Sequence, residues 1–174
     1  PQVADGICYG TTDLLLRENP QAIARTIKLQ LPQDLTVFSS PLTRCRLLAE
    51  ALHPAPLFDP RLKELNFGDW EMQAWEALNR DEINAWAKNP VDYAPPNGES
   101  VNELQARVHD FLAEHYAKKM TQAALVTHAG VMKVIVGLTQ GLAPAEWMAL
   151  KFGFGDVVPI QLTAAMMSGY LFRR

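Results

Sequence analysis

Twice in this chain a short apolar run ends at a polar residue and passes directly into a helix-forming pattern. The run TVFSSPLTRCR places Arg44 in the first turn of its helical pattern, and ALVTHAGVMK places His128 at the end of its apolar run. Short buried strands joined in this way to helices are typical of α/β domains with a mainly parallel sheet. Because ligands bind beyond the carboxyl ends of such strands, the sequence predicts that both residues face one site.

Hydrophobic periodicity predicts the other elements of the fold. We expect strands over residues 34–39, 124–127, 157–163 and 169–173, and helices from Pro41 to about His53, over 99–120 and over 131–141. Ser40 is the predicted N-cap of the first helix, and Gly141 the predicted end of the last. Pro159 makes the strand over 157–163 an edge strand or a bulged one.

Composition excludes several classes of protein. A chain of 174 residues, 48% of them hydrophobic, is long enough for one domain with a real core. The net charge of −3 provides no basic surface for nucleic acid, and no apolar run is long enough to cross a bilayer. Cys8 and Cys45 are too few for a disulfide framework and lack the spacing of a metal site. We therefore expect a cytoplasmic protein with no nucleic-acid, membrane or metal partner.

An arginine and a histidine at the ends of two strands suit a phosphate. The planar guanidinium of Arg44 can hold two phosphate oxygens at once. A cation in the first turn of a helix is unfavourable unless an anion lies nearby, which favours a functional role for Arg44. A histidine such as His128, taken alone at the end of an apolar strand, is more often a buried structural residue than a functional one. These two residues predict an anion site and no more.

Four segments, in order, give the chain a wider resemblance. They are SSPLTRC over 39–45, LKELNFGDWE over 62–71, NGES over 97–100 and VTHAG over 126–130. Together they resemble the histidine phosphatase superfamily, whose fold is also called phosphoglycerate mutase-like. Within it, the segment FGDWE and the later PPNGESVNELQARV are most similar to the alpha-ribazole phosphatase branch. The resemblance implies a three-layer α/β sandwich over residues 1–174, with helices on both faces and residues 68–100 as a cap.

The resemblance also implies roles for particular residues. Arg44 and His128 would bind the phosphoryl group, and Glu64 would be the proton donor, although without the motif Glu64 reads as an ordinary surface carboxylate. Substrate-binding residues would be Tyr9, Gly10, Thr11, Thr12, Glu99 and Ser100. The four tryptophans are expected to be packing residues, and Trp70 is the best candidate among them to wall a substrate pocket. No metal or other cofactor is expected, the implied partner is a small phosphomonoester, and a homodimer is compatible with the sequence.

The central residue of the family is not in this chain. The family's nucleophile is the histidine of an Arg-His-Gly motif, and the resemblance places that histidine one residue upstream of Pro1. His53, His109, His115 and His128 do not match it. The resemblance therefore favours an alpha-ribazole 5′-phosphate phosphatase that works through phosphohistidine. A phosphoglycerate mutase-like or broad-specificity phosphatase, and a non-catalytic phosphate-binding relic, are the alternatives.

Overall fold

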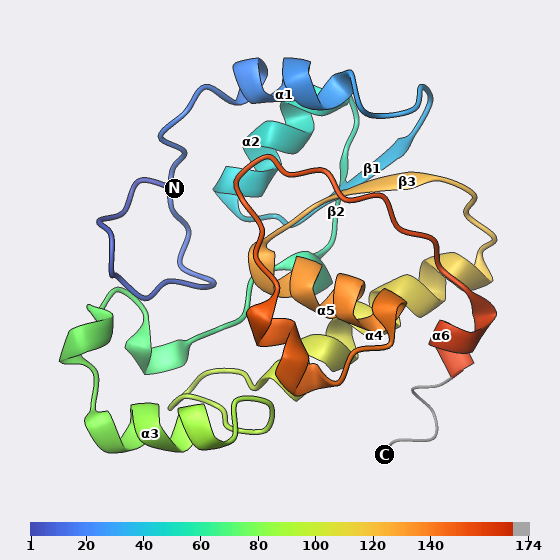
Figure 1. Ribbon diagram of the computed structural model, residues 1–174. Coiled ribbons are helices and arrows are strands. Elements are labelled where there is room, and N and C mark those ends of the chain that lie inside the picture. Colours follow the sequence, from blue (N-terminus) through green and yellow to red (C-terminus); the bar gives the residue numbers. More distant parts are fainter. Residues whose placement is uncertain (169–174) are drawn as a thin grey trace.

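The computed structural model describes residues 1–168 and is built on a parallel sheet of three strands (Figure 1). These are β1 (Thr36–Ser39), β2 (Leu57–Phe58) and β3 (Ala123–Val126). The order across the sheet is β2–β1–β3, with Ser39 opposite Val126 in β3 and opposite Phe58 in β2. Their carboxyl ends therefore meet at one edge, as the sequence predicted for the first and last of them.

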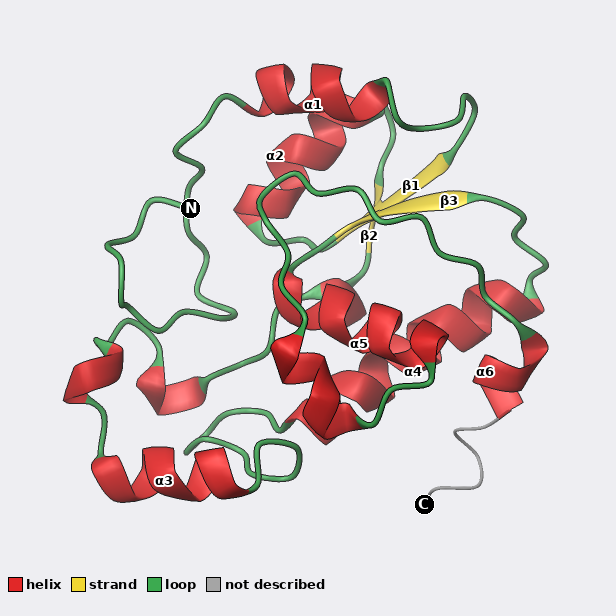
Figure 2. Ribbon diagram, viewed as in Figure 1, coloured by secondary structure: helices red, strands yellow, loops and turns green. Residues whose placement is uncertain are grey.

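Helices cover both faces of this sheet (Figure 2). On one side lie α1 (Pro20–Lys28) and α2 (Thr43–Leu52), and on the other α4 (Val101–Ala117) and α5 (Ala129–Gln140). The described chain also contains α3 (Arg80–Lys88), α6 (Ala164–Ser168) and 3-10 turns at Pro60–Leu62, Gly68–Trp70, Trp75–Ala77 and Pro144–Ala149. This arrangement confirms the predicted α/β sandwich.

The alternation of side chains along β1 explains why both faces are covered. Val37 packs in a cluster with Cys45 and Ala49 of α2, whereas its neighbour Phe38 packs into the larger core formed with α4 and α5. Successive residues of a strand point to opposite faces, so two buried neighbours require a helix layer on each side.

The two most periodic helical segments were predicted correctly. Helix α4 begins with a capping box, in which Ser100 and Glu103 each accept a hydrogen bond from the other's backbone N–H. Helix α5 ends at Gly141, whose φ of 67° is the left-handed conformation that a helix-terminating glycine adopts without steric cost.

The start of α2 was predicted wrongly. The helix begins at Thr43 and not directly after Ser40, whose hydroxyl accepts from the N–H of Leu42 in the preceding turn. The N–H and hydroxyl of Thr43 are bound instead by Asp13, at 2.7 and 2.8 Å. A carboxylate 30 residues away takes the place of the local cap, which local sequence patterns do not reveal.

The predicted strand over 157–163 is also absent from the structure, where these residues are irregular. A strand needs a neighbour to pair with, and Pro159 has no N–H to donate. Residues 157–162 instead line a cavity beside β3. The predicted strand over 169–173 lies outside the described residues.

Within residues 1–168, every helix is too short or too polar to span a lipid bilayer.

Candidate functional site

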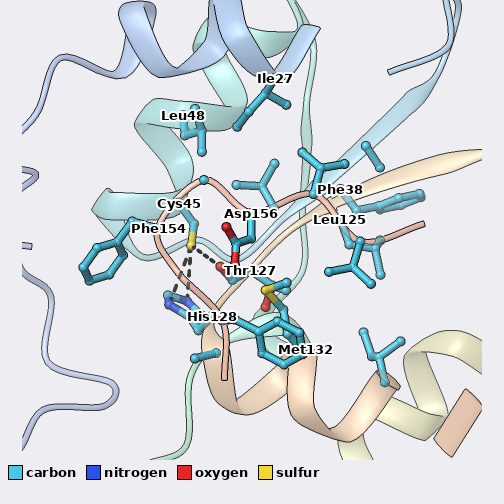
Figure 3. Close-up of a pocket in the computed structure, with 18 of the residues that line it drawn as sticks. Ile27, Phe38, Cys45, Leu48, Leu125, Thr127, His128, Met132, Phe154 and Asp156 are labelled. Atoms are coloured by element: carbon cyan, nitrogen blue, oxygen red, sulfur yellow. Dashed lines mark hydrogen bonds between the residues drawn. The ribbon is translucent and has the colours of Figure 1, made fainter. Parts of the chain in front are cut away.

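A cavity of about 1180 Å³ runs along the free edge of β3. Among residues 1–168, β3 pairs with β1 on one side only, and on the other side residues 123–128 line the cavity, opposite residues 152–162 (Figure 3). Its walls are mainly apolar, with Ile27 and Leu48 on one side and Met132 on the other. At the carboxyl end of β3 the lining becomes polar and includes Arg44, Glu64 and His128.

Arg44 is buried and held on all three of its nitrogens. Its Nε donates to Nδ1 of His128 at 3.2 Å, while Nη1 and Nη2 donate to the carbonyls of Thr12 and Gly10 at 2.9 and 2.5 Å. The guanidinium carbon also lies 5.8 Å from the centre of the Tyr9 ring. The planar fork is therefore fixed in one orientation at the first turn of α2.

His128 stands between β3 and α5, and its imidazole is neutral. Burial, with Arg44 and Arg107 as nearby cations, lowers its pKa to about 2. Since Nδ1 accepts from Arg44, the proton is on Nε2, which donates to the hydroxyl of Ser40 at 2.8 Å. Cys45 lies 3.5 Å from the ring, but burial raises the pKa of its thiol to about 12, so it stays protonated.

The surroundings of Glu64 shift it toward its protonated form. Part of the residue reaches solvent, yet surrounding atoms enclose its carboxyl group. This burial raises the pKa of Glu64, and it outweighs the hydrogen bonds from the N–H groups of Leu65 and Gly130, which lower that pKa. A Cβ on Gly130 would lie 2.1 Å from Oε1 of Glu64, so any larger residue there would displace the carboxyl group. The glycine of VTHAG thus makes room for Glu64.

Arg107 of α4 holds the segment that carries Glu64. Its guanidinium donates to the carbonyls of Arg61, Lys63 and Glu64 at 2.6, 2.8 and 3.0 Å. It also forms an ion pair with Glu99, at 2.7 Å. Glu99, predicted to bind substrate, is thus engaged in supporting Arg107, and it does not line the cavity.

The turn over residues 9–12 lies beside Arg44, but its donors do not face the cavity. Tyr9, which was expected to bind substrate, lines the cavity. Gly10, Thr11 and Thr12 were expected to offer phosphate donors; instead, the N–H and hydroxyl groups of Thr11 and Thr12 bind the carboxylate of Glu71. A charged carboxylate accepts stronger hydrogen bonds than a neutral group does, which explains why these donors turn toward Glu71.

Trp70 does not wall the cavity. Its side chain is 2% exposed, packs in a cluster with Cys8 and Leu78, and donates from Nε1 to Glu82 at 2.7 Å. The described residues of the predicted cap, 68–100, contribute no part of the cavity lining and contact residues 6–12 instead, for example through the N–H of Cys8 and the carbonyl of Gln73.

Ser100 is the N-cap of α4, so its replacement should affect stability and not binding. We expect Ser100→Ala to lower the free energy of unfolding by about 1 kcal/mol, whereas Ser100→Asn, which still caps, should retain most of it. Urea unfolding measures this, and titration with inorganic phosphate should give the same affinity for both variants and the parent. Equally weakened phosphate binding in both would instead make the hydroxyl a substrate contact.

Four residues that shape the site were not singled out as site residues from the sequence: Asp13, Ser40, Glu71 and Arg107. Each acts through a partner distant in the chain, or through backbone groups that the side-chain pattern does not show. No group of three or more metal-ligating side chains is found among residues 1–168.

Known proteins share this sequence pattern and fold. Residues 2–165 match the model of the histidine phosphatase superfamily (branch 1). The chain is 30% identical over 113 residues to a putative phosphoserine phosphatase 2 of Hydrogenobacter thermophilus, covering 61% of this chain and 56% of that protein. It is 30% identical over 125 residues to the adenosylcobalamin/alpha-ribazole phosphatase of Escherichia coli, covering 62% and 59%.

A solved structure with this fold is that of a phosphoglycerate mutase from Thermus thermophilus. It superposes with a TM-score of 0.64 at 36% identity, covering 80% of each chain. The matches to the two curated relatives span little more than half of each protein's length.

Proposed function

Because the chain belongs to the histidine phosphatase superfamily (branch 1), we propose that its site is that of a phosphomonoesterase working through a phosphohistidine intermediate. One observation carries this proposal: a fixed guanidinium, a neutral imidazole and an enclosed carboxyl group, from Arg44, His128 and Glu64, converge at one end of a single cavity. The arginine supplies positive charge for phosphoryl oxygens, and the carboxyl group supplies a proton.

The chemistry divides into two steps. A nucleophilic imidazole attacks phosphorus, the P–N bond forms as the P–O bond breaks, and Glu64 gives its proton to the leaving oxygen. Water then attacks phosphorus, the ionised Glu64 takes up a proton from that water, and the P–N bond breaks. Arg44 balances charge on the phosphoryl oxygens in both steps, since its fork is already oriented before substrate arrives.

His128 is unsuited to be that nucleophile. Its Nδ1 accepts from Arg44 and its Nε2 donates to Ser40, so both ring nitrogens are engaged in positioning. We propose that the attacking imidazole arrives on an extended segment that occupies the cavity in parallel with β3.

Three features of the cavity support such an occupant. The free edge of β3 offers backbone N–H and C=O groups that an added strand can pair with. The walls are mainly apolar, as the surroundings of a central parallel strand are. Pro1 itself lines the cavity, as does Arg44, so the start of the described chain lies beside the proposed path of this segment.

The test is to supply this segment in trans. A synthetic peptide of Val, Ile and Leu residues ending in Arg-His-Gly should bind the chain, raise its melting temperature and start hydrolysis of p-nitrophenyl phosphate. The matched peptide ending in Arg-Ala-Gly should bind equally and give no turnover, and an acid-labile phosphohistidine should form only on the first. Binding of both peptides without hydrolysis would contradict the proposed mechanism and favour a non-catalytic phosphate-binding protein.

The proposed substrate is a small phosphomonoester, and alpha-ribazole 5′-phosphate is the first compound to assay. The support is the likeness to the Escherichia coli adenosylcobalamin/alpha-ribazole phosphatase. The other relatives are named for activities on other phosphate compounds, phosphoserine and phosphoglycerate. These two compounds and a set of sugar phosphates therefore belong in the same assay.

A further inference from the structure

Glu71 gathers an unusual number of hydrogen bonds for a partly exposed carboxylate. Its Oε1 accepts from the N–H of Thr11 at 2.8 Å, the hydroxyl of Thr11 at 3.0 Å and the N–H of Phe67 at 3.0 Å. Its Oε2 accepts from the N–H of Thr12 at 2.6 Å and from the hydroxyl of the same residue. These bonds outweigh the effect of burial and lower the pKa of Glu71, so it is ionised at neutral pH.

The same short loop contacts Arg44 on its other side. While the N–H groups of Thr11 and Thr12 point to Glu71, the carbonyls of Gly10 and Thr12 accept from the two terminal nitrogens of Arg44. Residues 10–12 thus form a bridge, with a carboxylate at its donor side and a guanidinium at its acceptor side.

Close packing leaves this bridge little freedom. A Cβ on Gly10 would lie 1.9 Å from the carbonyl oxygen of Leu65 and 2.8 Å from Oε1 of Glu71, so the loop is pressed against the segment that bears Glu71. Just beyond it, Asp13 binds the N–H and hydroxyl of Thr43 at the start of α2. The loop therefore fixes both the helix that carries Arg44 and the fork of its side chain.

We propose that Glu71 is a positioning residue for anion recognition, which sets the direction of the Arg44 guanidinium through the carbonyls of loop 10–12. This rests on the proposed function, in which Arg44 binds the phosphoryl group. Among the described residues, the bonds to Gly10, Thr12 and His128 engage three of the five N–H groups of Arg44. Two N–H groups therefore remain for a phosphate.

Charge and position predict opposite results for Glu71→Gln. Removing a negative charge near an anion site should strengthen phosphate binding by Coulomb attraction alone. A positioning role predicts weaker binding, because glutamine has a single acceptor oxygen and its NH₂ group cannot accept from Thr11 or Thr12. Glu71→Asp keeps the charge but is one methylene too short to reach all five donors.

The experiment is calorimetric titration of the folded chain with inorganic phosphate at fixed ionic strength. We expect Glu71→Gln and Glu71→Asp both to weaken binding about tenfold, as for loss of one charge-assisted contact. The matched control is Glu103→Gln, which removes a carboxylate that also accepts two bonds, from the N–H and hydroxyl of Ser100, but does not touch loop 10–12. Unchanged or tighter phosphate binding by both Glu71 variants would overturn the proposal.

A second measurement does not depend on phosphate. The Nε–H proton of Arg44, bonded to His128, should exchange slowly with solvent by ¹⁵N NMR in the parent and in Glu103→Gln, and rapidly in both Glu71 variants. If the parent fails to bind phosphate while this difference is present, the proposed function fails and the positioning role stands. Equal protection of Arg44 in all the proteins would overturn the positioning role.

Discussion

Replacing Glu64 by Gln is expected to slow hydrolysis of an alkyl phosphomonoester by about 10²- to 10⁴-fold, the usual contribution of a general acid. An alkoxide is a poor leaving group and needs a proton as the P–O bond breaks. Burial of the Glu64 carboxyl raises its pKa, so the residue holds that proton at a pH where an exposed glutamate has lost it.

The leaving group separates this role from a structural one. A p-nitrophenolate departs without protonation, so in the first step Glu64→Gln should release p-nitrophenolate at a rate within about tenfold of the parent. Single-turnover rates of leaving-group release with both substrates, in protein supplied with the nucleophile peptide, give the comparison, because the later water step is common to both. An equal loss with both substrates would mean that Glu64 acts on binding or folding and not as the proton donor.

The parts of this molecule that sequence reasoning predicted are those governed by neighbours in the chain. Helix α4 follows from apolar residues at helical spacing, and the end of α5 follows from Gly141, because hydrophobic period and helix termination are local properties. The cavity that receives Arg44 and His128 follows from one further rule, that parallel strands share a carboxyl edge.

The parts that failed depend on contacts between distant segments. Asp13 caps α2 from 30 residues away, and Glu71 takes the donors of Thr11 and Thr12 from about 60 residues away. Trp70 was expected at a pocket because aromatic rings often form pocket walls, but the aromatic neighbours Trp86 and Tyr93 enclose it in a separate cluster. Spacing in the chain carries no information about these pairings.

The state of the His128 imidazole predicts how stability changes with pH. The pKa of His128 is about 2 in the folded protein against an ordinary value of 6.5, so below pH 6.5 the unfolded chain binds a proton that the folded chain does not. The contribution of His128 is fully present above pH 6.5 and is lost progressively as the pH falls. Each pH unit costs up to about 1.4 kcal/mol, which amounts to roughly 2.3 kcal/mol between pH 6.5 and 4.5.

His128→Gln should remove this slope, because glutamine does not titrate. Glu64 has the opposite effect on stability, because its pKa is raised in the folded state, which therefore binds the proton first as the pH falls. Burial lowers the pKa of His115, so this residue adds to the loss of stability at low pH. Both contributions are common to the two proteins and cancel in their difference. Urea unfolding at several pH values should therefore show the stability of the parent, relative to His128→Gln, falling by about 2 to 3 kcal/mol from pH 6.5 to 4.5.

If the stabilities of the two proteins changed equally with pH, with equal m values, the imidazole would take up a proton in the folded state. It could then no longer accept from Arg44, and the fixed geometry on which the proposed phosphate recognition depends would be lost.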